Sequence, residues 1–208
     1  MKNCVFCDKE KIRYDILYET EDLFVKVGFA ISAPGQVMVI SNEHLPCFGA
    51  MSNWSGYDSL KKRVQQAIRE GFDADPFLIE FGVWGQSVNH AHTHFIPSQS
   101  NEYRIESLVD EMFSHSGMPI EEADIDGLRG VYQKEGGYVS IEEKGQLYIV
   151  HVTKVIYDAN NPFHNTRTFL NKRKGLHLPN DWRNMNPQER AQDEEKRSIT
   201  KKQLTSLL

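Results

Sequence analysis

The sequence has few cysteines, no long apolar run and no surplus of basic residues. The three cysteines among 208 residues are too few, and odd in number, for a disulfide framework. No apolar run approaches the roughly 20 residues that a membrane span requires, and the N-terminus has no apolar segment of signal-peptide length. The formal net charge of -5 provides no general basic surface. We therefore expect a cytoplasmic protein with neither a membrane nor a nucleic acid as its partner.

The residues that are present predict a folded chain with more strands than long helices. Hydrophobic content of 39% supports a core. Strands are expected at 16–27 (two, around an acidic turn), 36–40, 77–84 and 90–97, and a hairpin at 138–152 that turns near Lys144-Gly145. Helices are expected at 55–71, capped by Ser55 and Gly71, at 104–115 and at 162–173. The charged tail from Asn186 is predicted to be a surface helix or partly disordered. Because consecutive strands lie close in sequence, the predicted fold class is α+β with a mainly antiparallel sheet.

The most informative segment is 89–97, with the sequence NHAHTHFIP. On a strand, His90, His92 and His94 would point to one face. Each histidine would lie about 6.5–7 Å from the next along the chain. Three rings along a flat strand converge poorly on one metal ion. The spacing therefore favours divided roles, with one histidine for structure, one for chemistry and one for the substrate. The alternative is a row of polar residues on a half-exposed strand.

The second informative pattern is the Cys-x-x-Cys pair of Cys4 and Cys7. Such a pair supplies half of a tetrahedral zinc site. His44, after the apolar strand at 36–40, and His90 complete a closed shell of two sulfurs and two nitrogens that is typical of structural zinc. The alternatives are a redox pair and two ordinary thiols. A redox pair is disfavoured because the motif lies at the start of the chain and not between a strand and a helix.

These motifs, in this order, resemble the histidine triad (HIT) superfamily of nucleotide hydrolases and transferases. The family's His-x-His-x-His signature and two following apolar residues match HAHTHFI at 90–96, and the lead-in GQSV at 85–88 also matches. APGQVMVISNEH at 33–44 resembles the family's upstream strand, and Cys-x-x-Cys matches its zinc-bearing branch. The resemblance covers about residues 1–98. It implies an antiparallel sheet with two flanking helices, and usually a homodimer.

The same resemblance implies a chemistry. The middle histidine, His92, would attack the α-phosphorus of a nucleotide, and water would release the nucleotide from the covalent nucleotidyl-histidine. His94 and Ser87 would assist the phosphoryl transfer, and Gln86, Ser87 and His94 would bind the substrate. The first histidine, His90, would be a zinc ligand. A histidine at the third position favours the hydrolase branches, which act on nucleoside phosphoramidates or dinucleoside polyphosphates.

The sequence also departs from the family pattern. Gln36 stands where the family usually has histidine, and Gly28 falls near a ribose-binding aspartate. FLIEFGVWGQ at 77–86 lacks an asparagine often used at the nucleotide site, with Glu80 or Trp84 in its place. Glu80 is alternatively a surface or salt-bridged strand residue. These differences leave the nucleoside undefined.

The departures leave other functions open. One is a non-catalytic nucleotide-sensing or partner-binding module, and another is a hydrolase with zinc held by the histidine row. A DNA-end processing role is disfavoured by the acidic balance.

The family resemblance divides the chain into a HIT-like catalytic domain at 1–100 and a C-terminal extension at 101–208. The extension would comprise a helix, the hairpin, a basic helical segment and the charged tail. Its basic residues would form either a lid that meets substrate phosphates or a solvated helix face anchored by Trp182; they are Arg167, Lys172, Arg173, Lys174 and Arg183. Three further histidines, His151, His164 and His177, are expected to be ordinary surface or core residues.

Overall fold

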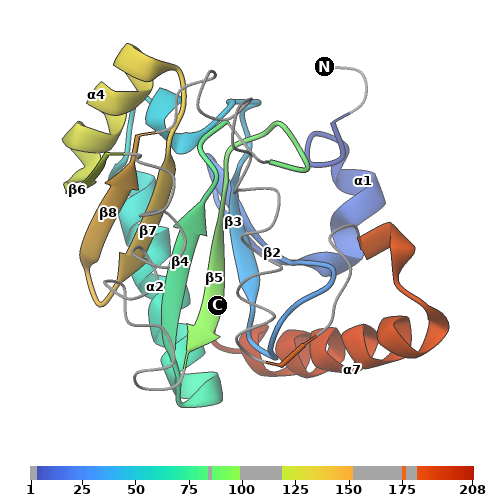
Figure 1. The fold of residues 1–208 in the computed structure, drawn as a ribbon. Coiled ribbons are helices and arrows are strands. Elements are labelled where there is room, and N and C mark those ends of the chain that lie inside the picture. The colour runs from blue at the N-terminus through green and yellow to red at the C-terminus, as the bar shows by residue number, and fades with distance from the viewer. Residues whose placement is uncertain (1–3, 84–85, 99–118, 152–174, 177–181) are drawn as a thin grey trace.

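The structure is a computed structural model that describes residues 4–83, 86–98, 119–151, 175–176 and 182–208 (Figure 1). The helices are α1 (Lys9–Ile12), α2 (Ser55–Phe72), α4 (Ile125–Glu135) and α7 (Pro187–Leu204), with short 3-10 helices η1 (Arg13–Asp15), η2 (Phe48–Ala50) and η5 (Trp182–Asn184). The strands are β1 (Ile16–Glu19), β2 (Leu23–Val27), β3 (Val37–Ser41), β4 (Asp75–Glu80), β5 (His92–Ser98), β6 (Ile120–Glu122), β7 (Val139–Glu143) and β8 (Gln146–Val150).

These strands form one sheet of eight strands in the order β1-β2-β3-β5-β4-β7-β8-β6. Each described pair is antiparallel, including β4 with β7. The strands of the extension therefore continue the sheet that begins in the N-terminal half (Figure 1). The predicted α+β class with a mainly antiparallel sheet is confirmed.

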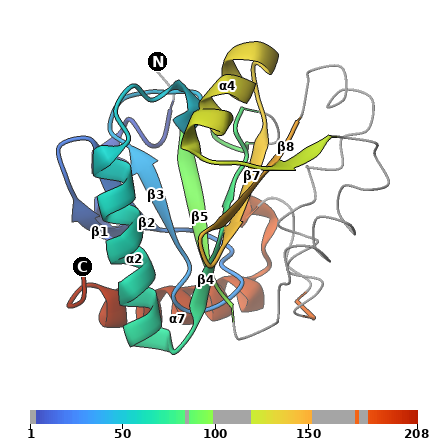
Figure 2. The ribbon, with the colours of Figure 1, turned by 90° about the vertical axis from the view of Figure 1, so that its left-hand side faces the viewer.

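Helix α2 covers one face of the sheet (Figure 2). Its spacing places Tyr57, Leu60, Val64 and Ile68 on one side, and all four are buried against the inward side chains of the strands. The predicted helix is confirmed, but both predicted caps are wrong. Ser55 is the first helical residue, after the N-cap Trp54, and the helix ends at a left-handed Asp73 with φ 48°.

The opposite face of the sheet carries a smaller apolar cluster. The N-terminal segment supplies Phe6 and Ile12, which pack against Phe24, Met38 and Ile40 of β2 and β3. The first turns of the chain are thereby held against the strands that neighbour β5.

The predicted hairpin is confirmed as β7 and β8. Lys144 and Gly145 form its turn with φ values of 51° and 83°, a conformation that glycine adopts at no steric cost. Helix α4, which precedes the hairpin, was not predicted. Its start is marked by Asp124, whose side chain accepts a hydrogen bond from the Gly127 N–H, and its end by a left-handed Gly136.

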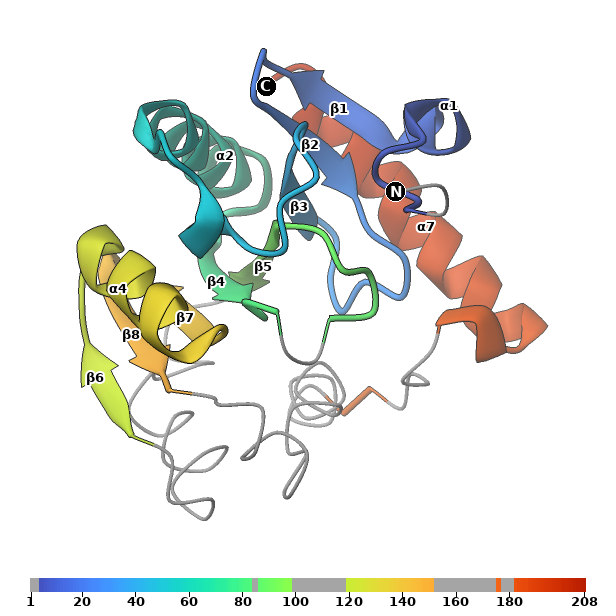
Figure 3. The ribbon, with the colours of Figure 1, turned by 90° about the horizontal axis from the view of Figure 1, so that it is seen from above.

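The charged tail forms α7, whose start carries a capping box between Asn186 and Glu189. The helix lies along the end of the sheet where β2 leads into β3 (Figures 1 and 3). Its buried side is mostly polar, with Leu204 packed in the main core. Asp193 accepts a hydrogen bond from the Ile31 N–H at 2.9 Å, and Thr200 accepts one from the Gly35 N–H at 2.8 Å.

An ion cluster also joins α7 to the N-terminal strands. Asp15 is buried and pairs with Arg197 at 2.5 Å and Lys201 at 2.7 Å. The Lys26 ammonium, buried beside the same carboxylate at 3.5 Å, has a pKa lowered to about 8 by desolvation. The tail is therefore integrated into the fold, which its composition did not indicate.

Some predictions lie outside the described residues. These are the helices at 104–115 and 162–173, the basic residues Arg167, Lys172, Arg173 and Lys174, and His164 and His177. The division at residue 100 stays a prediction. No helix in the described ranges has the length and apolar character to cross a membrane.

Candidate metal centre and histidine row

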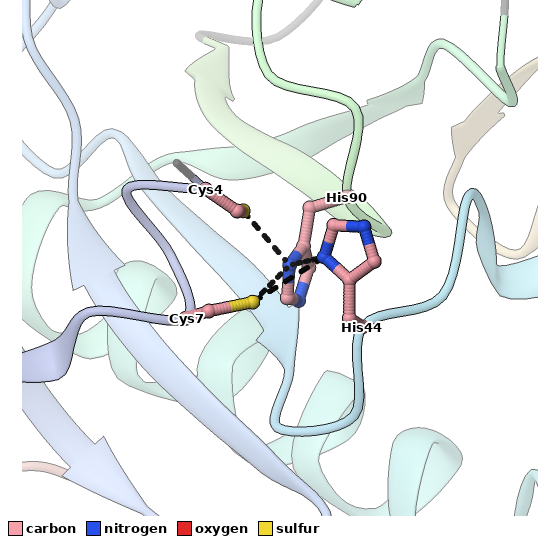
Figure 4. A group of neighbouring side chains, drawn as sticks. All are labelled: Cys4, Cys7, His44 and His90. Atoms are coloured by element: carbon pink, nitrogen blue, oxygen red, sulfur yellow. Dashed lines mark hydrogen bonds between the residues drawn. The ribbon is translucent and has the colours of Figure 1, made fainter. Parts of the chain in front are cut away.

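Four side chains from three separate segments meet at one end of β5 (Figure 4). Cys4 and Cys7 come from the N-terminal turn, His44 from the loop after β3, and His90 from the residues just before β5. Their ligand atoms all lie within 4.8 Å of one another. These are the four residues predicted to form the metal shell.

The distances in this cluster fit a tetrahedral ion. The His90 Nδ1 atom lies 3.4 Å from the Cys4 Sγ atom and 3.6 Å from the Cys7 Sγ atom, and the Nδ1 atoms of His44 and His90 lie 3.2 Å apart. Zinc–sulfur bonds of about 2.3 Å and zinc–nitrogen bonds of about 2.0–2.1 Å in a tetrahedron imply edges of about 3.5 Å and 3.4 Å. Cys4, Cys7, His44 and His90 could therefore hold a metal ion.

The ring of His90 is oriented for ligation by its outer contact. Its Nε2 atom lies 2.7 Å from the backbone oxygen of Ser41, which can only accept, so Nε2 carries the hydrogen and Nδ1 presents a lone pair. Burial lowers the pKa of His90 and so favours the neutral form that a metal requires. Phe6, between the two cysteines, packs edge-on against the rings of His90 and His92.

His92 and His94 project from β5 on the face that also carries the Phe6 cluster. Their cross-strand partners on β3 are Ile40 and Met38, and their ring centroids lie 5.1 Å apart. Thr93, between them, bonds to the Tyr57 hydroxyl of α2 on the opposite face at 2.9 Å. The predicted alternation of faces is present here.

The strand begins at His92 and runs through Pro97 to Ser98, so it starts later and ends later than predicted.

The surroundings of His92 fix its charge and its tautomer. The side chain is 4% exposed, and burial lowers its pKa to about 4. Its Nδ1 atom donates to the His90 carbonyl oxygen at 2.6 Å. Since that oxygen can only accept, Nδ1 carries the hydrogen and Nε2 carries the lone pair. The ring is therefore neutral at pH 7, with a nucleophilic nitrogen directed away from the backbone.

The lead-in residues have distinct surroundings. Ser87 is exposed. Gln86 donates to the Pro46 carbonyl at 2.9 Å and accepts from the His90 N–H at 3.1 Å, so its amide braces the loop before β5. Gln36 bonds to the backbone N–H and hydroxyl of Ser32, inside the β2–β3 connection.

Glu80 lies on the other face of the sheet from the histidine row. It is paired across the strands with Thr93 and buried, and it accepts hydrogen bonds from the Phe48 N–H at 2.7 Å and the Tyr138 hydroxyl at 2.8 Å. Its interpretation as a nucleotide-site residue is not supported by this position. The expectation of a surface or salt-bridged residue is wrong, because its partners are an amide and a phenol.

Sequence reasoning missed the residues that support the row. The Ser41 contact uses a backbone oxygen, which has no sequence signal. Phe6, in contrast, was visible as the one aromatic residue inside Cys-x-x-Cys. Trp182, considered above as an anchor, stacks on Phe29 with centroids 4.7 Å apart. His151, expected to be ordinary, lies between Glu121 and Glu135 of the extension.

The chain is similar to several known proteins. No protein-family model matches the chain. An uncharacterised HIT-like protein of Methanocaldococcus jannaschii is 29% identical over 100 residues, which is 45% of this chain and 78% of that protein. A zinc-bound histidine triad family protein from Mycobacterium smegmatis is 24% identical over 48% of this chain and 78% of its own, with a TM-score of 0.43. A HIT family hydrolase from Clostridium thermocellum is 25% identical over 50% and 98%, with a TM-score of 0.40.

The curated relative and the motifs agree. The relative matches 100 residues, and the four ordered motifs span about residues 1–98 of this chain. The Cys-x-x-Cys pair and the first histidine of the row meet in one cluster, which the resemblance to the zinc-bearing branch led us to expect. The chain is therefore similar to HIT-like proteins in its motifs and in the cluster that they form.

Proposed function

We propose that the chain is a nucleotide hydrolase that cleaves a phosphoanhydride or phosphoramidate bond at the α-phosphate. His92 is the nucleophile, and the intermediate is a nucleotidyl-histidine. The observation that carries the proposal is the state of the His92 ring, which is neutral through burial and held with Nδ1–H on the His90 carbonyl. An imidazole in this tautomer offers Nε2 to phosphorus.

The reaction proceeds in two displacements. The Nε2 lone pair forms a bond to the α-phosphorus while the bond from phosphorus to the leaving group breaks, and the leaving group takes a proton. Water then attacks the phosphorus and gives up a proton, which replaces the one that the leaving group took. The phosphorus–nitrogen bond breaks, and the nucleoside monophosphate leaves with His92 neutral again. The His90 carbonyl stabilises the positive ring during the intermediate, because it accepts from Nδ1–H at 2.6 Å.

His94 and Ser87 are proposed to act on the phosphate. The His94 ring is partly exposed and neighbours the His92 ring, so it is placed to donate to phosphoryl oxygens as charge develops. Ser87 is exposed and is proposed as a donor to the substrate or the leaving group. Gln86, for which a substrate contact was also predicted, is proposed to act by holding the His90 backbone.

Cys4, Cys7, His44 and His90 are proposed to hold a structural zinc ion. Zinc bound there would supply no chemistry to the substrate, since four protein ligands close its coordination shell. It would fix His90, whose carbonyl in turn orients His92. The proposed substrate partner is a small nucleotide, and a cytoplasmic location remains our expectation.

The test uses His92→Ala in the full chain with a panel of nucleoside phosphoramidates and dinucleoside polyphosphates. We expect turnover to fall by at least about a thousandfold, as is usual when the nucleophile of an enzyme is substituted. The zinc content should not change. His151→Ala is the control, because it removes an imidazole that directly follows β8, and β8 lies three strands from β5. Trapping of a nucleotidyl adduct on intact protein by mass spectrometry should occur with the control and not with His92→Ala. Wild-type turnover by His92→Ala would overturn the assignment.

A second candidate is a non-catalytic nucleotide-binding module. The 4% exposure of His92 favours it, since a nucleophile must reach its substrate. Binding of nucleotides without turnover across the panel would support this candidate. A hydrolase with its metal on the histidine row receives no such support, because the metal-competent group found among the described residues includes His90 and neither His92 nor His94.

A further inference from the structure

The extension contributes strands to a sheet edge that the HIT-like half would otherwise leave open. Within residues 4–98, the strand order ends at β4, which pairs with β5 along its whole length from Asp75 to Glu80. On its other side β4 pairs with β7, where Leu78, Ile79 and Glu80 face Glu142, Ile141 and Ser140. Unpaired edge strands are templates for pairing with another chain. Here the place of that other chain is taken by the extension.

The β4 edge is suited to pairing, because its central side chains are apolar and buried. Phe77, Leu78 and Ile79 are each at most 2% exposed. The strand itself carries no lysine and no bulge that would protect it, and its proline, Pro76, lies near the start. Uncovered, this strand would expose both apolar surface and unpaired backbone groups.

Tyr138 joins the extension to the edge through buried polar contacts. Its hydroxyl donates to Glu80 and accepts from the Gly49 N–H, both at 2.8 Å, and its own N–H donates to the Gly82 carbonyl at 2.9 Å. The ring lies flat against glycine backbone: a Cβ atom at Gly82 would meet it at 2.4 Å, and one at Gly49 at 2.8 Å. The two glycines thus admit a ring that no other residue there would allow.

Two more contacts secure the same junction. Lys61 of α2 pairs with Glu142 of β7 at 2.9 Å, and both side chains are largely buried. Helix α4 packs Leu128 and Val131 against Cys47 and Tyr138, next to the turn η2. The extension is therefore packed into the core rather than laid on its surface.

The edges that remain in the described sheet are protected. β6 has three residues, two of them exposed glutamates, and β1 has four residues with a register shift between Ile16 and Tyr18. Short, charged or irregular strands are how proteins prevent pairing at sheet edges.

We propose that residues 119–150 are a built-in partner for β4, so that a second copy cannot pair with this edge and the chain functions as a monomer. The proposal differs from the homodimer that the family resemblance implies. It is independent of the proposed hydrolase activity.

The first test is the mass and amide exchange of the full chain in solution. Over a hundredfold range of protein concentration we expect a mass of 24.0 kDa by light scattering and an exchange rate of the 75–82 segment that does not change. A mass of two chains, or protection of this segment that grows with concentration, would overturn the proposal.

The second test opens the edge. The Tyr138 N–H points to β4, and so do those of Ser140 and Glu142, because alternate residues of a strand share a direction. Ser140→Pro removes one of these donors, and we expect it to self-associate with rising concentration, while Ser140→Ala keeps the donor and stays monomeric. A folded, monomeric Ser140→Pro protein with a freely exchanging β4 would contradict the proposal. If that variant does not fold, the wild-type measurements decide.

Discussion

Removing the Tyr138 hydroxyl tests the junction between the two halves of the chain. Tyr138→Phe keeps the ring against Gly49 and Gly82, so no cavity forms. It removes the donor to the Glu80 carboxylate, a bond to a charged group that contributes about 1.5–3 kcal/mol. It also leaves the Gly49 N–H without its acceptor, at a cost of about 1–3 kcal/mol. We expect a loss of about 3–5 kcal/mol, which is large against a typical unfolding free energy of about 5–15 kcal/mol.

The assay is urea denaturation followed by tryptophan fluorescence. Burial raises the Glu80 pKa to about 7, and the Tyr138 hydrogen bond opposes that rise. The variant's Glu80 pKa is therefore higher still, and its loss of stability should be larger at about pH 8 than at about pH 5.5, where Glu80 is protonated in both proteins. Tyr14→Phe, at an exposed tyrosine, should change little. A Tyr138→Phe loss below about 1 kcal/mol at pH 8, or the same loss at both pH values, would refute this account.

Three further predictions concern the metal cluster, the buried carboxylate and α7. Cys7→Ser should lower bound zinc from one ion per chain to a small fraction by elemental analysis, whereas Cys47→Ala, outside the cluster, should keep it. Because the folded-state pKa of Glu80 is raised from 4.5 to about 7, the free energy of unfolding should fall by about 3 kcal/mol as pH rises through this window; Glu80→Gln should lack this decline in the same urea titrations. Thr200→Val leaves the buried Gly35 N–H without an acceptor and should cost about 1–3 kcal/mol by denaturation, and an unchanged midpoint would argue against that contact.

The parts of the fold that sequence predicted are those with a strong local signal. The apolar spacing of α2, the turn at Lys144-Gly145 and the alternation around His92 are each contained within one segment. The metal cluster was predictable because cysteine and histidine are uncommon and their chemistry restricts their use.

The rest depended on contacts between distant segments. In sequence, Asp193 and Thr200 belong to a charged tail that predicts solvated polar residues. In the structure both are buried, because backbone N–H groups of the β2–β3 connection need acceptors. Glu80 was expected to be either near the nucleotide site or a surface or salt-bridged strand residue, because its actual partner Tyr138 is 58 positions away. A polar residue's burial is decided by such partners, and one sequence does not name them.

The pairing of Asp15 with Arg197 and Lys201 has a consequence for synthesis of the chain. The carboxylate lies before the first strand, and its arginine partner is 182 positions later. While the ribosome makes the intervening residues, the N-terminal strands lack the helix that neutralises this charge and fills the β2–β3 end of the sheet. Contacts this far apart slow folding, because a long loop must close before they form. The nascent protein should therefore stay loosely packed, and open to chaperones and proteases, until α7 has emerged.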